Sequence, residues 1–174
     1  MSAHPPRPRL VVRVGITGHR WNKLDRKARE PLEGQVRRVL LAVQEIATRL
    51  GNLPESGYRD PGPGAEPVIP ELRLISPLAE GSDRIFVDGA PPGCTLQAIL
   101  PFPPDIYAKD FTEERSRERL DQYLARARGE AGVLVLDGDR NASNAFEPVG
   151  TAVCLNSDLL VTIWDGEPGK RGGT

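Results

Sequence analysis

The chain has little of what marks nucleic-acid binders, membrane proteins and secreted proteins. Its formal net charge is -1 and only 5% of its 174 residues are aromatic, so it lacks the basic surface and stacking rings of a general DNA or RNA binder. No apolar run approaches the roughly 18 residues of a membrane span, and the opening residues, MSAHPPRPR, contain no apolar signal core. We therefore expect a soluble, cytoplasmic protein with neither a nucleic-acid nor a membrane partner.

Cysteine is also scarce. Cys94 and Cys154 stand apart in apolar contexts, without the CxxC spacing typical of structural zinc sites. We expect both to be buried free thiols in a reducing compartment, and we expect neither a metal site nor a cofactor.

Five stretches rich in β-branched and apolar residues predict strands, at 9–17, 71–76, 95–100, 132–136 and 158–164. The fourth, GVLVL, is a continuous apolar run of the kind found in parallel strands covered on both faces. An apolar stripe from Leu24 to Leu50 predicts a long amphipathic helix that ends at Gly51.

Three shorter helices are predicted between the remaining strands. The first begins near Leu78 or Ala79, and the last covers 148–156. The second follows an extended loop at 101–111 and a capping box formed by Asp110 and Glu113. Its predicted buried positions are Leu120, Tyr123, Leu124 and Ala127.

This alternation predicts a single α/β domain over 10–174, with a Rossmann-like, doubly wound and mainly parallel sheet and helices on both faces. Residues 1–9 are expected to form a flexible tail, and 51–70 a Gly/Pro-rich loop. After the fifth strand the chain runs through DGEPGKRGGT, where another helix would normally follow. The domain is therefore expected to be truncated at its C-terminal end.

Polar residues directly after the predicted strands are the candidate site, because ligands of open parallel sheets bind beyond the carboxyl ends of the strands. VGITGHR and GKRGGT combine glycines, which let backbone N–H groups approach an anion, with basic side chains. Neither stretch is a GxGxxG fingerprint or a GxxxxGK[ST] loop, so dinucleotide oxidoreductases and P-loop NTPases lose their main support.

Each candidate has a structural alternative. VGITGHR is also compatible with a simple chain reversal, and a histidine such as His19 is more often a hydrogen-bonded turn residue than a ligand contact. Asp83 and Arg84 either hold a ribose and a phosphate or pair on a helix surface. Trp164 either stacks on a base or covers the edge of the sheet, and Asp165 is a candidate for reading a hydroxyl.

Four motifs in order, VGITGHR, ISPLAEGSDR, ILPFPPDIYAKDF and SDLLVTIWDGEPGKRGGT, resemble the SLOG superfamily of Rossmann-like nucleotide-binding domains. That group includes lonely-guy phosphoribohydrolases, DNA-processing DprA proteins and the nucleotide-sensing domains of TRPM channels. The sequence is most similar to bacterial proteins with a GxTGHR turn, some of which are fused to effector domains.

The resemblance implies a ligand site at the ends of the strands, with a phosphate-binding turn at its last three residues. Together with the residue-level candidates, the predicted ligand-binding residues are Gly15, Thr17, Gly18, His19, Arg20, Ser76, Glu80, Gly81, Asp83, Arg84, Trp164, Asp165, Gly166, Gly172, Gly173 and Thr174.

Two functions stay open on this basis. The first is a sensor module that binds a nucleotide or a nucleotide-derived signal, attached to or partnered by an effector domain such as a TIR-type domain. The second is a phosphoribohydrolase-like enzyme that cleaves the N-glycosidic bond of nucleoside 5′-monophosphates. The hydrolase branch relies on a glutamate one helical turn beyond its glycine turn, which this sequence does not contain, and Glu80 is the remaining catalytic candidate. We favour binding, and homo-oligomerisation stays open.

Overall fold

The structure is a computed structural model that describes residues 8–59 and 64–166. Five strands form one sheet in the order β4-β3-β2-β1-β5, and every neighbouring pair is parallel. The strands are β1 (Val11–Gly18), β2 (Glu71–Ser76), β3 (Thr95–Leu100), β4 (Val133–Val135) and β5 (Leu159–Ile163). The predicted Rossmann-like α/β fold is confirmed.

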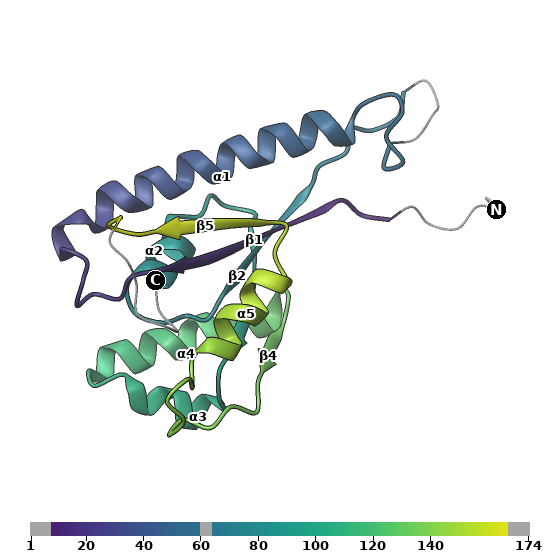
Figure 1. The fold of residues 1–174 in the computed structure, drawn as a ribbon. Coiled ribbons are helices and arrows are strands. Elements are labelled where there is room, and N and C mark those ends of the chain that lie inside the picture. Colours follow the sequence, from purple (N-terminus) through teal and green to yellow (C-terminus); the bar gives the residue numbers. More distant parts are fainter. Residues whose placement is uncertain (1–7, 60–63, 167–174) are drawn as a thin grey trace.

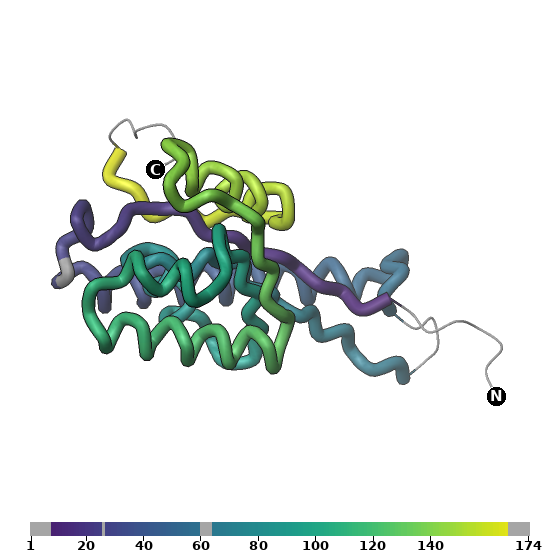
Figure 2. Tube along the Cα trace, turned by 90° about the horizontal axis from the view of Figure 1, so that it is seen from below, coloured from purple at the N-terminus to yellow at the C-terminus, as the bar shows by residue number. Residues whose placement is uncertain are grey.

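Helices cover both faces of the sheet (Figure 1). They are α1 (Arg29–Gly51), α2 (Ser82–Gly89), α3 (Pro104–Tyr107), α4 (Glu114–Gly129) and α5 (Glu147–Leu155). Figure 2 shows β1 running between α4 on one side and α5 on the other. Parallel strands are joined by right-handed crossovers, so connections that step from β1 towards β4 place their helices on one face, and the return from β4 to β5 places α5 on the opposite face.

The core has two parts, one for each face. The larger joins inward residues of α1, α2 and α4, such as Leu40, Phe86 and Leu124, to alternate residues of the inner strands. The smaller lies under α5, where Val149 and Val153 pack against Ile75 and Ile99. The predicted buried stripe of α4 is confirmed, since Leu120, Tyr123, Leu124 and Ala127 are all buried.

The fourth strand departs from its prediction. It has only three residues and lies at the edge of the sheet, where the Leu134 and Val135 side chains are 42% and 41% exposed. The expectation that both faces of this strand are covered is wrong. An unbroken apolar run does not reveal whether a strand has one neighbour or two, because that depends on the order of strands in the sheet.

Three helix starts also differ from expectation. The first helix begins at Arg29 rather than near Leu24. The second helix begins at Ser82 rather than near Leu78, because Leu78 and Gly81 have φ angles of 64° and 99°, which an α-helix cannot contain. Asp110 does not cap α4; it lies 2.6 Å from the Arg140 guanidinium and ends a short 3-10 turn, Ala108–Asp110. Part of the predicted extended loop is helical, as α3.

Nowhere in the ranges 8–59 and 64–166 does a helix combine the length and the apolar character needed to cross a membrane.

Candidate functional site

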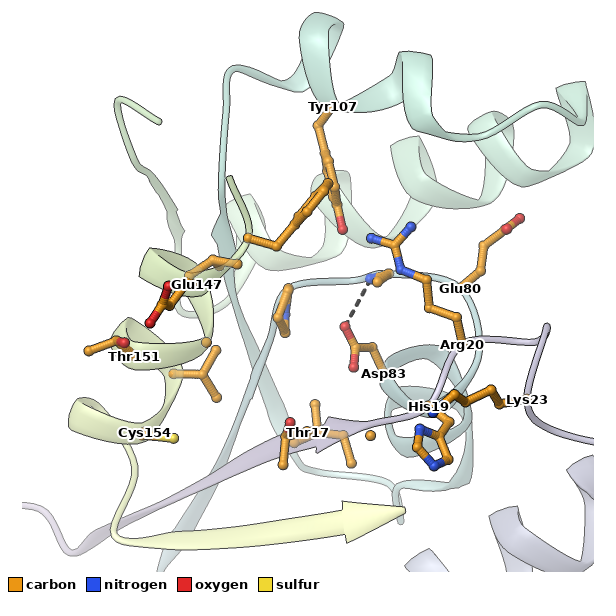
Figure 3. Close-up of a pocket in the computed structure, with 18 of the residues that line it drawn as sticks. Thr17, His19, Arg20, Lys23, Glu80, Asp83, Tyr107, Glu147, Thr151 and Cys154 are labelled. Atoms are coloured by element: carbon orange, nitrogen blue, oxygen red, sulfur yellow. Dashed lines mark hydrogen bonds between the residues drawn. The ribbon is translucent and has the colours of Figure 1, made fainter. Parts of the chain in front are cut away.

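A cavity of about 440 Å³ opens at the carboxyl end of β1. β1 lies between β2 and β5, so the strand order reverses there, and crevices at such reversals are where open α/β sheets bind ligands. The walls come from the turn after β1, the connection from β2 to α2, the α3 helix and one face of α5 (Figure 3).

The turn after β1 is fastened on two sides through its backbone. The His19 N–H donates to the Ile163 carbonyl of β5 at 3.0 Å, and the His19 carbonyl accepts from the Ser82 N–H at 3.0 Å and from its hydroxyl at 2.8 Å. A Cβ on Gly18 would lie 2.5 Å from the Ile163 carbonyl oxygen, so this close approach requires glycine. The turn is therefore held rigidly against both neighbours.

The His19 side chain supports the turn. Its imidazole is almost completely buried, and Figure 3 shows it pointing away from Arg20 and Asp83. The Nε2 atom lies 2.8 Å from an Asp165 carboxylate oxygen, an ion-pair distance without the alignment of a hydrogen bond. This contact ties the segment after β5 to the turn, which favours the structural alternative for His19.

Arg20 extends into the cavity (Figure 3). Its guanidinium carbon lies 5.0 Å from the centre of the Phe146 ring, a cation–π arrangement. Among the described residues it has neither a hydrogen bond nor an ion pair, so its N–H donors face the cavity unpaired. Lys23 also lines the cavity and adds a second positive charge.

Asp83 is the most deeply buried acid of the cavity, with its residue 6% exposed. One carboxylate oxygen, Oδ2, accepts a hydrogen bond from the Ala79 N–H at 3.0 Å. Burial raises the pKa of Asp83 to about 7, against the opposing effects of the Ala79 bond and of the positive charges of Arg20 and Arg84. The Tyr107 hydroxyl points towards the same space (Figure 3), and burial raises its pKa well above the ordinary value.

Glu80 and Arg84 point towards α4. The Glu80 carboxylate accepts a short hydrogen bond from Ser116, and Arg84 donates to the same hydroxyl at 2.8 Å. The buried Arg84 guanidinium lies 4.8 Å from the centre of the Phe111 ring, and desolvation lowers its pKa. Glu80 lines the cavity and also a second cavity beside α4, whereas Arg84 lines only the second. Asp83 and Arg84 thus face different cavities.

Six predicted site residues line the cavity, and three more lie behind its walls. Thr17, Gly18, His19, Arg20, Glu80 and Asp83 are lining residues. Gly15 is buried against Ser157, which lies between α5 and β5, and a Cβ on Gly15 would meet the Ser157 hydroxyl. The Ser76 hydroxyl accepts from the Leu78 N–H at 3.1 Å. These two residues, with Gly81, shape the walls from behind.

Residues 164–166, which follow β5, are not among the residues that line the cavity. All three are exposed, and an Asp165 carboxylate oxygen lies 2.8 Å from His19 Nε2. Gly172, Gly173 and Thr174, the predicted phosphate turn, fall outside the described residues.

Sequence reasoning missed the wall that α5 contributes. Phe146, Thr151 and Cys154 line the cavity from this helix and its N-terminal flank, opposite Tyr107 of α3. The sequence signal for this wall is the helix predicted between the fourth and fifth strands, because that connection must cross the sheet next to the reversal of strand order. The prediction of a buried thiol is confirmed for Cys94 and wrong for Cys154, which is exposed.

A metal centre has no support in the part of the chain that the structure describes, where no group of three or more histidine, cysteine, aspartate or glutamate side chains is arranged to hold an ion. No family model matches the chain, and no curated protein or solved structure is similar enough to it to count as a match.

Proposed function

We propose that the cavity binds a nucleotide or a nucleotide-derived signal, and that the chain serves as a ligand-recognition module. One observation carries this proposal: the Arg20 guanidinium extends into the cavity, stacked on Phe146, with none of its donors used by a described residue. A guanidinium offers five N–H donors in a planar fork that matches phosphate oxygens, and a phosphate would satisfy them.

The position and lining of the cavity support the proposal. It opens at the reversal of strand order, and its volume of about 440 Å³ falls within the usual range for small-molecule sites. α5 contributes Val149, Thr151 and Val153 to the cavity wall, opposite Tyr107. The proposal agrees with the resemblance to the SLOG superfamily, which stays a prediction, as do a signalling role, an effector domain and a cytoplasmic location.

Titration calorimetry with AMP, ADP and cyclic AMP tests the proposal. We expect saturable binding of at least one of them, and Arg20→Ala should weaken it about 10- to 100-fold, since hydrogen bonds to charged groups contribute about 1.5–3 kcal/mol. Arg38→Ala is the matched control, because Arg38 is an exposed arginine of α1 away from the cavity, and its affinity should equal that of the wild type.

Two outcomes would contradict the proposal. One is the absence of binding by the wild-type protein at millimolar concentrations of all three nucleotides. The other is equal affinity of the Arg20→Ala and Arg38→Ala variants, which would remove Arg20 from the site.

A second candidate, hydrolysis of the N-glycosidic bond of a nucleoside monophosphate, has one observation in its favour. Asp83 and Glu80 line the same cavity, and the pKa of Asp83 near 7 suits a general acid at neutral pH. Incubation with AMP separates the two functions. Free adenine and ribose 5-phosphate that accumulate in proportion to protein, and that are lost in Asp83→Asn or Glu80→Gln, would replace the pure binding function with an enzymatic one.

A further inference from the structure

Only one of the two carboxylate oxygens of Asp83 accepts a hydrogen bond from a described residue. Its Oδ2 atom accepts from the Ala79 N–H, whereas the other oxygen, Oδ1, has no hydrogen-bond donor among the described residues. The residue is nevertheless 6% exposed and belongs to the cavity lining. Oδ1 is not enclosed by the protein, so it reaches the cavity, where a ligand can donate a hydrogen bond to it.

None of the described charged or titratable neighbours of Asp83 donates a hydrogen bond to Oδ1. Arg84 donates to the Leu78 carbonyl and the Ser116 hydroxyl. Arg20, from the turn after β1, is stacked on Phe146. Tyr107, from α3, makes no hydrogen bond to Asp83. A ligand in the cavity can therefore supply a donor to Oδ1.

We propose that Asp83 is the specificity residue of this cavity and that its free oxygen accepts a hydrogen bond from a sugar hydroxyl of the ligand. The ligand class is then a sugar phosphate ester, such as a nucleotide with free ribose hydroxyls, in preference to its deoxy analogues. This inference rests on the proposed function, because it takes the ligand's phosphate to be at Arg20.

Because Asp83 lies close to Arg20, we expect its hydrogen-bond donor to be a sugar hydroxyl and not a group on the base. The positive charge of Arg20 reaches Asp83, and Figure 3 shows the two side chains in the same part of the cavity. The donor that Asp83 reads must therefore lie near the phosphate. In a nucleoside 5′-phosphate the ribose is joined directly to the phosphate, and the base lies beyond the ribose.

This role has a pH signature that a purely structural role lacks. The ionised carboxylate accepts a stronger hydrogen bond than the neutral acid. The pKa of Asp83 is about 7, so the preference for a hydroxyl-bearing ligand should grow between pH 6 and pH 8. Of the charged and titratable groups near Asp83, Arg20 and Arg84 carry a positive charge and Tyr107 stays neutral in this range, because burial raises its pKa.

The test compares AMP with 2′,3′-dideoxy-AMP, which has the same base and phosphate, by calorimetry at pH 6 and pH 8. For the wild type we expect AMP to bind at least about tenfold tighter at pH 8, with a smaller ratio at pH 6. In Asp83→Asn the ratio should fall to within about threefold and lose its pH dependence, while the affinity for the dideoxy ligand is retained. Asp121→Asn, at an exposed acid of α4, is the matched control and should behave as the wild type.

Each result decides the matter. A wild-type protein that binds AMP and the dideoxy analogue equally well overturns the role of Asp83 while leaving phosphate binding at Arg20 in place. A preference for AMP that persists in Asp83→Asn, or that does not change with pH in the wild type, overturns it too. Absence of binding of both ligands to the wild type overturns the proposed function itself.

Discussion

Replacing Gly81 by alanine tests how tightly the turn after β1 is held. Gly81 precedes α2 with φ 99° and ψ -125°, a region that only glycine occupies readily. A Cβ there would lie 2.5 Å from the His19 carbonyl oxygen and 2.7 Å from the Arg20 Cα. Both are backbone atoms, so the contact cannot be relieved by a side-chain rotation, and the turn itself must move.

The expected loss follows from two contributions. The unfavourable backbone conformation costs about 1–3 kcal/mol. Displacing the His19 carbonyl weakens the two hydrogen bonds it accepts from Ser82, each worth about 1 kcal/mol. Gly81→Ala should therefore lower the free energy of unfolding by about 3–5 kcal/mol, and it should also reduce nucleotide affinity, because Arg20 moves with the turn.

Urea denaturation provides the measurement, and Gly93→Ala is the matched control. Gly93 has a similar φ of 92°, but a Cβ there would meet no atom within 4 Å. Its substitution should cost only the conformational part, about 1–3 kcal/mol. If the two variants are equally stable, the close approach of Gly81 to the turn contributes nothing and the reasoning fails.

Three further predictions concern stability. Gly34→Ala should raise the free energy of unfolding by about 0.5–1 kcal/mol in urea, because the site is inside α1 with no atom within 4 Å of the new Cβ. Leu40 is fully buried on α1, so Leu40→Ala should lower the free energy of unfolding by about 2–5 kcal/mol. Leu41 is 47% exposed, so Leu41→Ala should lower it by less than about 1 kcal/mol. Equal losses would contradict the packing of α1. Asp83 has a folded pKa of about 7, above its unfolded value of about 4, so the folded state holds more protons between these values. Wild-type stability should then fall as pH rises from 4 to 7, and denaturation at pH 5 and pH 7 should show a smaller fall in Asp83→Asn.

Most of the fold could be predicted, because the spacing of apolar residues indicates the strands and helices, and glycine and proline mark where they end. The second and third strands match their predicted ranges exactly at both ends, and Gly129 ends α4 as expected. Strand order could not be read from the sequence, so the exposure of Leu134 went unrecognised. The start of α2 was misplaced because the positive φ of Leu78 is imposed by its surroundings, not by its residue type.

The candidate site was predictable where it follows a strand directly. Arg20 and Asp83 were found in this way, since parallel strands bring their carboxyl ends to one edge. The wall from α5, including Phe146, was not, because it depends on a crossover that spans the sheet. The neighbouring Asp83 and Arg84 side chains also point in different directions because of how they pack. No local sequence pattern predicts this.

The central position of β1 has a consequence for the order in which the molecule is made. Among the strands in the described residues β1 comes first, yet one of its two neighbours comes last: Val14 pairs with Leu159, and the His19 N–H bonds to the Ile163 carbonyl. A growing chain released from the ribosome up to α4 would hold β1 with one side unpaired and without the cavity wall that α5 supplies. The cavity walls are therefore complete only when α5 and β5 have been added, and until then β1 is the strand most in need of protection from other chains.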